Sequence, residues 1–261
     1  VLENNELFLA NGGSGIFQSG SLSTFTNNDR LLLNSLNDPY TISTRIVNNS
    51  SATIDVQQGN VRLTNAGEHN APTFAVSEDA SLSFYSGNHV FNGLITTQPA
   101  GDFIIRTNFS TESGSTQFNI TGTGLYWENG ELTSGTITNT GSITMPGGGS
   151  TGLNGGTLIN AGEMTLMGSN FRIMHPGELQ NESTFTVAND FNILTGSPEP
   201  GSFINSGLFH KSGGESISQV RSQMINESEG EIRLTAGETR FLSRFEHKKD
   251  ASITGNGIID L

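Results

Sequence analysis

The sequence predicts an all-β chain wound as a parallel β-helix, a β-solenoid of roughly 12 coils with about 21–24 residues in each. Three observations predict this fold. An asparagine recurs about every 21 residues, apolar and polar residues alternate after it, and no window shows the helical spacing of apolar residues. A short period of β-forming residues is typical of wound structures, in which each repeat buries its apolar face against its neighbours.

The most regular signal is an asparagine that lies two residues after an apolar residue. One set, spaced by 21, 21, 24 and 21 residues, is Asn139, Asn160, Asn181, Asn205 and Asn226, and an earlier set, spaced by 23 and 21, is Asn4, Asn27 and Asn48. Equivalent residues of adjacent coils lie about 4.8 Å apart, so each amide can donate to the asparagine of the next coil. We therefore predict a structural ladder of amides stacked at one edge, formed by Asn27, Asn48, Asn139, Asn160, Asn181, Asn205 and Asn226. We also expect these corner asparagines to use the left-handed backbone conformation.

Alternating apolar residues follow the asparagines and predict a strand with one buried face in each coil. The inward pairs are Ile143/Met145, Met164/Leu166 and Phe185/Val187. The residues between them, Thr144, Thr165 and Thr186, then form an outward column of threonines. Such a column is used by ice-binding solenoids, but Asp55 and Arg233 replace threonine on coils of the same pattern. Strand propensity therefore explains these threonines better than ice binding does.

The uniform repeat predicts a single β-solenoid domain over residues 1–261, with an irregular register between about 65 and 120. In that stretch Asn92 lies 44 residues beyond Asn48, which matches two coils of 22. Both ends of the sequence continue the repeat without a capping segment. We therefore expect a fragment of a longer surface protein, flanked by more solenoid or by capping domains of the same chain.

Charge and composition limit the partners. The net charge of -13, from 12 Lys+Arg against 25 Asp+Glu, argues against nucleic acid or an anionic membrane. The absence of cysteine excludes a disulfide scaffold. No stretch approaches the roughly 18 apolar residues of a membrane span, so we expect no membrane insertion of this segment.

Residues with catalytic or ligating chemistry are scattered along the sequence. The acidic residues share no column that would hold Ca²⁺ or form a catalytic pair. The five histidines have no metal-ligand spacing, and they are His69, His89, His175, His210 and His247. We therefore predict no enzyme activity, no catalytic residue, no metal site and no cofactor.

One segment has the composition of a sugar contact, and its four candidate ligand-binding residues are Tyr126, Trp127, Glu128 and Asn129. An aromatic ring can stack on a sugar ring while amides and carboxylates bind its hydroxyl groups. Strand alternation buries Leu125 and Trp127 and exposes Tyr126, or does the reverse if the strand bulges. The only tryptophan of the chain is therefore either a core residue, which we favour, or a ligand contact.

Three units of the sequence resemble the repeats of large bacterial surface proteins: GTGLYWENGEL at 122–132, GTITNTGSITM at 135–145 and GTLINAGEMTL at 156–166. The resemblance is to filamentous-haemagglutinin-like adhesins and to the β-helical passenger domains of autotransporters. It implies a right-handed β-helix, an extracellular location at the bacterial cell surface, and often adhesion. The chain lacks the Asn-Pro-Asn-Gly motif of the haemagglutinin secretion domain, so the resemblance does not fix the export route.

The expected function is a non-catalytic adhesin or stalk segment, a secreted and rigid scaffold that displays binding loops. The expected partner is a host or cell-surface glycan or protein. One alternative is a carbohydrate-binding or carbohydrate-active β-helix, similar to a polysaccharide lyase or hydrolase. The other alternative is an ice-binding solenoid.

Overall fold

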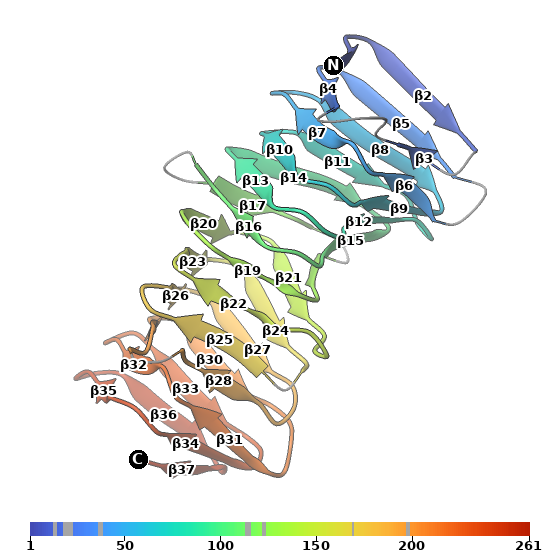
Figure 1. The fold of residues 1–261 in the computed structure, drawn as a ribbon. Helices are drawn as coiled ribbons and strands as arrows, with labels where there is room; N and C mark the ends of the chain where they lie inside the picture. Colours follow the sequence, from blue (N-terminus) through green and yellow to red (C-terminus); the bar gives the residue numbers. More distant parts are fainter. Residues whose placement is uncertain are drawn as a thin grey trace. The chain divides into compact units, whose positions relative to one another are not determined.

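The computed structural model describes residues 1–12, 15–17, 23–35, 39–112, 116–121, 124–168, 170–196 and 199–261. These residues form β-strands and no helix. The chain divides into two compact units, Val1–Tyr126 and Trp127–Leu261. In each unit three parallel sheets are wound as a β-solenoid, and the described strands make about 11 turns (Figure 1). The predicted all-β parallel β-helix is thus confirmed, whereas the single domain over residues 1–261 stays a prediction.

In the first unit each turn contributes its first strand to sheet A, its second to sheet B and its third to sheet C. Sheet A contains β1 (Leu2–Asn4), β4 (Thr24–Asn27), β7 (Arg45–Asn48), β10 (Gly67–Asn70), β13 (His89–Asn92) and β16 (Phe109–Ser110). Sheet B contains β2 (Leu7–Asn11), β5 (Arg30–Asn34), β8 (Thr53–Gln58), β11 (Thr73–Val76), β14 (Leu94–Pro99) and β17 (Thr116–Asn119). Sheet C contains β3 (Gly15–Ile16), β6 (Tyr40–Ile42), β9 (Asn60–Leu63), β12 (Ser81–Phe84) and β15 (Asp102–Ile105). The boundary between the units falls within β18 (Leu125–Trp127).

The second unit repeats this order of strands. Its sheet A contains β19 (Gly130–Leu132), β22 (Thr151–Asn154), β25 (Asn170–Met174), β28 (Asn192–Leu194), β31 (Ile217–Val220), β34 (Glu238–Phe241) and β37 (Ile258–Asp260). Its sheet B contains β20 (Thr136–Asn139), β23 (Thr157–Asn160), β26 (Glu178–Asn181), β29 (Ser202–Asn205), β32 (Gln223–Asn226) and β35 (Phe245–His247). Its sheet C contains β21 (Ser142–Met145), β24 (Glu163–Leu166), β27 (Thr184–Val187), β30 (Leu208–Lys211), β33 (Glu231–Leu234) and β36 (Ser252–Gly255).

The core of each unit consists of inward residues stacked turn on turn. In the second unit Ile143 pairs with Met164 and Met164 with Phe185, and all three side chains are buried, as the alternation predicted. In the first unit the rings of Phe74, Phe84 and Phe103 meet edge-on or tilted, 5.0–5.7 Å apart between centroids. Because no turn covers its own apolar face, this continuous stack supplies the hydrophobic stabilisation.

The stretch between about 65 and 120, where the sequence showed an irregular register, continues the winding. Gly67 pairs with His89, Thr73 with Thr96 and Leu82 with Phe103, at separations of 22, 23 and 21 residues. Asn92 pairs with Asn70 and does not continue the column of Asn48. Asn92 in β13 thus lies two turns beyond Asn48 in β7, as predicted, but it is one residue past the position that stacks on Asn48 through His69.

The outward threonine column is present but short. Thr144, Thr165 and Thr186 stack in register in sheet C, and the same column continues with His210 and Arg233. Asp55 was expected at an equivalent position, yet it lies in sheet B of the first unit, paired with Leu32. The sequence pattern around Asp55 resembles that of sheet C because every strand of the solenoid alternates in the same way.

Candidate functional site

A buried column of side-chain amides closes one corner of the first unit. The Nδ2 of Asn4 donates to Oδ1 of Asn27 at 2.8 Å, and the Nδ2 of Asn27 donates to Oδ1 of Asn48 at 3.1 Å. Each amide also donates to a backbone carbonyl of the next turn, at Arg30 and Thr53 respectively. Asparagine suits this place because its short side chain carries two donor hydrogens and an acceptor.

The second unit has a longer column of the same kind. Its hydrogen bonds run from Nδ2 to Oδ1 through Asn139, Asn160, Asn181, Asn205 and Asn226, at 2.7–2.8 Å. All five side chains are fully buried. The column continues from Asn226 to Nδ1 of His247 at 3.2 Å. Buried amides therefore hold successive turns together along this corner.

The two columns occupy different corners, so the single ladder drawn from the sequence was wrong in this respect. In the first unit the asparagines end strands of sheet A, whereas in the second unit they end strands of sheet B. From β7 to β20 the chain advances 13 strands, which is four turns of three strands and one strand more. This extra strand explains why Asn48 and Asn139, 91 residues apart, do not fit a whole number of turns.

The backbone at these corners also differs from the expectation. Positive φ angles occur at several glycines and, among the other described residues, at Ser51, Ala71, Asp79 and Asp250, so the ladder asparagines are not left-handed. Each of them is the last residue of a strand and keeps extended backbone. After Asn160 the glycine two residues later, Gly162, is needed for close approach of the turns. A Cβ on Gly162 would lie 2.2 Å from the backbone oxygen of Gly141 in the preceding turn.

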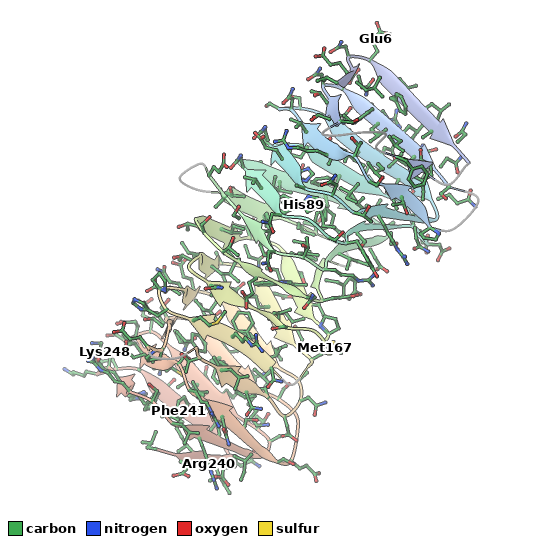
Figure 2. The ribbon with its side chains drawn as sticks, viewed as in Figure 1. Glu6, His89, Met167, Arg240, Phe241 and Lys248 are labelled. Carbon is green, nitrogen blue, oxygen red and sulfur yellow. The ribbon has the colours of Figure 1, made fainter. Side chains whose placement is uncertain are left out.

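Two histidines extend the column of the first unit. The Nδ1 of His69 lies 2.8 Å from Nδ2 of Asn48, and the Nε2 of His69 lies 3.0 Å from Nδ1 of His89. Both rings are completely buried, and Figure 2 shows His89 inside the first unit. Burial lowers the pKa of His69 well below its usual range, and burial lowers the pKa of His89 to about 4. Both rings are therefore neutral at pH 7.

The four residues singled out as a sugar contact differ in their accessibility. The side chains of Leu125 and Trp127 are 1% exposed, and the indole nitrogen of Trp127 donates to the carbonyl of Gly130 at 3.0 Å. The ring of Trp127 also makes an edge contact with Phe171. Trp127 is thus a core residue, and the alternative of a stacking contact with a sugar does not fit its burial. Tyr126 and Glu128 are half-buried and Asn129 is exposed, and their role in ligand binding stays a prediction.

A cluster of two arginines and a tyrosine lies on the outer side of sheet C in the first unit, and the sequence analysis missed it. The guanidinium carbon of Arg62 lies 5.0 Å from the centroid of the Tyr85 ring, and that of Arg106 lies 5.7 Å from the same centroid. Arg62 is in β9, Tyr85 follows β12 and Arg106 follows β15. Their spacing of 23 and 21 residues is the only signal in the sequence, and it has meaning only once the turns are aligned.

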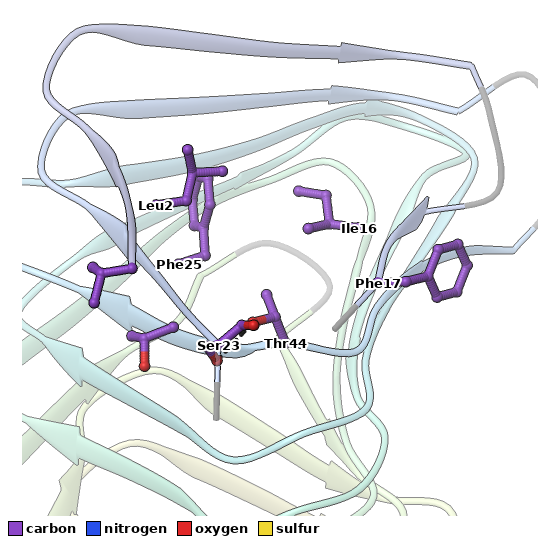
Figure 3. Close-up of a pocket in the computed structure, with 8 residues that line it drawn as sticks. Leu2, Ile16, Phe17, Ser23, Phe25 and Thr44 are labelled. Atoms are coloured by element: carbon purple, nitrogen blue, oxygen red, sulfur yellow. Dashed lines mark hydrogen bonds between the residues drawn. The ribbon is translucent and has the colours of Figure 1, made fainter. Parts of the chain in front are cut away.

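An open apolar pocket of about 310 Å³ lies at the first turn of the first unit (Figure 3). Its lining includes Leu2, Ile16, Phe25 and Thr44, and the hydroxyl of Thr44 donates to the carbonyl of Ser23 at 2.8 Å. Phe25 and Thr44 are buried, whereas the side chains of Leu2 and Phe17 are exposed by half or more. Among the described residues that line this pocket, none has a charged side chain.

Among the residues that the structure describes, no group of three or more His, Asp or Glu side chains could hold a metal ion. In the part of the chain that the structure describes, no helix has the length and apolar character to cross a membrane.

Comparison of the chain with protein-family models, with curated proteins and with solved structures gives no match. The resemblance to bacterial surface repeats therefore stays a prediction.

Proposed function

We propose that this chain is a non-catalytic segment of an extracellular protein at the bacterial cell surface, where it acts as an adhesin or stalk. Its role is that of a rigid β-solenoid scaffold that displays binding loops at its corners. The observation that carries this proposal is the column of buried amides in each unit, Asn4 to Asn48 and Asn139 to Asn226.

These columns support a mechanical role because, within each unit, they join successive turns by buried hydrogen bonds. Bending or stretching a unit would break these buried hydrogen bonds. Because the amides are shielded from solvent, the broken bonds would leave unpaired polar groups, which costs free energy. The amides of the columns use their donors on neighbouring asparagines and on backbone carbonyls, for instance Asn160 on Asn181 and on Thr184. The hydrogen bonds of these amides therefore connect neighbouring turns.

Stretching a single molecule from its two ends tests the mechanical role. A scaffold held turn by turn should lengthen in steps, and one turn of 21 residues should release up to about 70 Å. The Asn160→Ala chain should yield at lower force in the second unit. Smooth extension at low force, without steps, would contradict a load-bearing scaffold.

Surface labelling tests the location. An antibody raised against this chain should stain intact cells of the source organism, and protease added to intact cells should remove the signal. A cytoplasmic protein of the same cells serves as the control for leakage. Staining that requires lysed cells would contradict the surface location.

A further inference from the structure

The cluster formed by Arg62, Tyr85 and Arg106 has the geometry of a binding surface. Strand alternation places Val61, Leu63 and Phe84 inward, where they are fully buried, so Arg62 and Tyr85 point outward. Tyr85 is 44% exposed. The guanidinium groups of Arg62 and Arg106 come from the turns before and after that of Tyr85, each about 4.8 Å away, and both lie over its ring. Cation–π contacts of this kind hold long arginine side chains in place before a ligand arrives.

The charge pairing of Arg62 differs from that of most basic residues. Most arginine and lysine side chains have a nitrogen within 4.0 Å of a carboxylate oxygen of the same chain. These residues are Arg30, Arg45, Arg172, Lys211, Arg233, Arg240, Arg244 and Lys248. Arg62 forms no such ion pair with a described residue, and its contact is the ring of Tyr85. Arg106 makes further contacts besides the ring. A guanidinium stacked on a ring still presents its in-plane N–H groups, which match a carboxylate in a bidentate manner.

Hydroxyl groups surround Arg62 on the same face. Thr41 and Ser83 are its neighbours in the adjacent turns, by strand register. Ser83 is 3% exposed, and its hydroxyl has no hydrogen-bond partner among the described residues. The hydroxyl of Ser83 is thus covered, whereas Thr41 is half-buried and offers a hydroxyl beside Arg62. A carboxylate next to several hydroxyl groups is the complement of such a surface.

We propose that Arg62, Tyr85 and Arg106 bind a short acidic sugar, a uronic-acid oligosaccharide. Arg62 holds the carboxylate, while the phenol of Tyr85 and the hydroxyl of Thr41 bond the sugar oxygens. The net charge of -13 repels long polyanions, which limits the ligand to a short chain. This activity goes beyond that of a scaffold, and it does not require the cell-surface location, so either proposal can fail without the other.

Titration calorimetry of the full chain with trigalacturonate tests the proposal. The wild-type chain should bind trigalacturonate in the millimolar range or tighter, and the trimethyl ester of the same sugar, which has no charge, should not bind. Arg62→Gln should weaken binding at least about tenfold, because it removes a bidentate charged hydrogen bond. Arg45→Gln is the matched control, since Arg45 is an exposed arginine of the same unit that pairs with Glu68. Its affinity should equal that of the wild type.

Thermal melting shows whether each variant is folded. If Arg62→Gln does not fold, Arg62→Lys keeps the charge and loses the planar fork, so it should still bind several-fold more weakly. No binding by the folded wild type at millimolar sugar would overturn the proposal, as would equal binding of the methyl ester or undiminished binding by Arg62→Gln. Equal binding of the peptide Glu-Glu-Glu would overturn the assignment to a sugar and point to an acidic protein segment.

Discussion

The Nε2 atom of His69 lies 3.0 Å from the Nδ1 atom of His89, inside the aromatic core of the first unit. The ring of His69 stacks on Phe91 at 5.0 Å and meets Phe84 edge-on at 5.2 Å. The ring of His89 meets Phe84 edge-on at 4.9 Å. A hydrogen bond between two neutral imidazoles needs one donor and one acceptor nitrogen, so protonating both rings would remove the acceptor and place two like charges side by side.

The first prediction concerns acid. In the unfolded chain these histidines take up protons near pH 6.5, whereas in the folded chain burial lowers the pKa of His89 to about 4 and that of His69 well below 6.5. The unfolded state therefore binds more protons below pH 6.5, and stability falls as the pH drops from 6.5 towards 4. For His89 alone the loss should reach about 3 kcal/mol. Urea unfolding followed by circular dichroism between pH 7 and 4 measures it.

Carboxylates also titrate in part of this range, so the prediction needs a variant without the buried histidines. The chain with His69→Gln and His89→Gln should be less stable at pH 7 but should lose much less stability in acid. His210→Gln is the control, because His210 is only partly buried. An acid dependence that is the same in the double glutamine variant and in the wild type would refute the role of the pair.

The second prediction concerns Gly67, which leaves space for the two rings. A Cβ on this residue would lie 2.7 Å from Nδ1 of His89 and 2.8 Å from Nε2 of His69. Gly67→Ala should therefore destabilise the chain by about 1–3 kcal/mol through overpacking. In a chain with His89→Ala the same change should cost less, because the clash with one of the two rings is gone. If the losses of stability from Gly67→Ala and His89→Ala simply add, Gly67 is not required to accommodate the His89 ring.

The third prediction concerns the amide column of the second unit. Asn160→Ala removes the donor to Oδ1 of Asn181 and to the carbonyl of Thr184, at 2.8 and 2.9 Å, and it leaves both acceptors buried. The expected loss of stability is about 2–5 kcal/mol, since each buried unpaired group costs about 1–3 kcal/mol. Asn154→Ala is the control because Asn154 is exposed, and it should change stability by less than about 0.5 kcal/mol. Urea midpoints that coincide for the two variants would argue against the column as a source of stability.

The fourth prediction concerns Lys211, a fully buried cation in an inward column of sheet C. Its Nζ donates to the carbonyl of Gly213 at 2.7 Å and lies 3.4 Å from Oδ1 of Asp190. Lys211→Met keeps the apolar stem but removes the donor, so it should destabilise the chain by about 1–3 kcal/mol. Lys249→Met, at an exposed lysine, should leave the unfolding midpoint unchanged. A Lys211→Met chain as stable as the wild type would mean that these acceptors are satisfied without the lysine.

The local sequence pattern was sufficient to predict the strands, but it was insufficient to predict which side chains form the candidate sites. The alternation at Ile143 and Met145 predicts a half-buried strand whatever lies beside it, and the structure buries both side chains. The burial of Trp127 and the contact of Arg62 with Tyr85 depend on which side chains meet across turns. A change of a residue or two in corner length alters those meetings without changing the alternation.

The sequence by itself determined that the chain winds in turns of about 21 residues with asparagine at a corner, because alternation and repeat length are local properties of the chain. Only the tertiary structure decided which corner carries each column and that His69 and His89 continue the one from Asn48. The physical reason is that a strand ends in the same way at all three corners of a turn. An asparagine two residues after an apolar residue is therefore compatible with any of these corners. Which corner it occupies is fixed by the stacking of neighbouring turns.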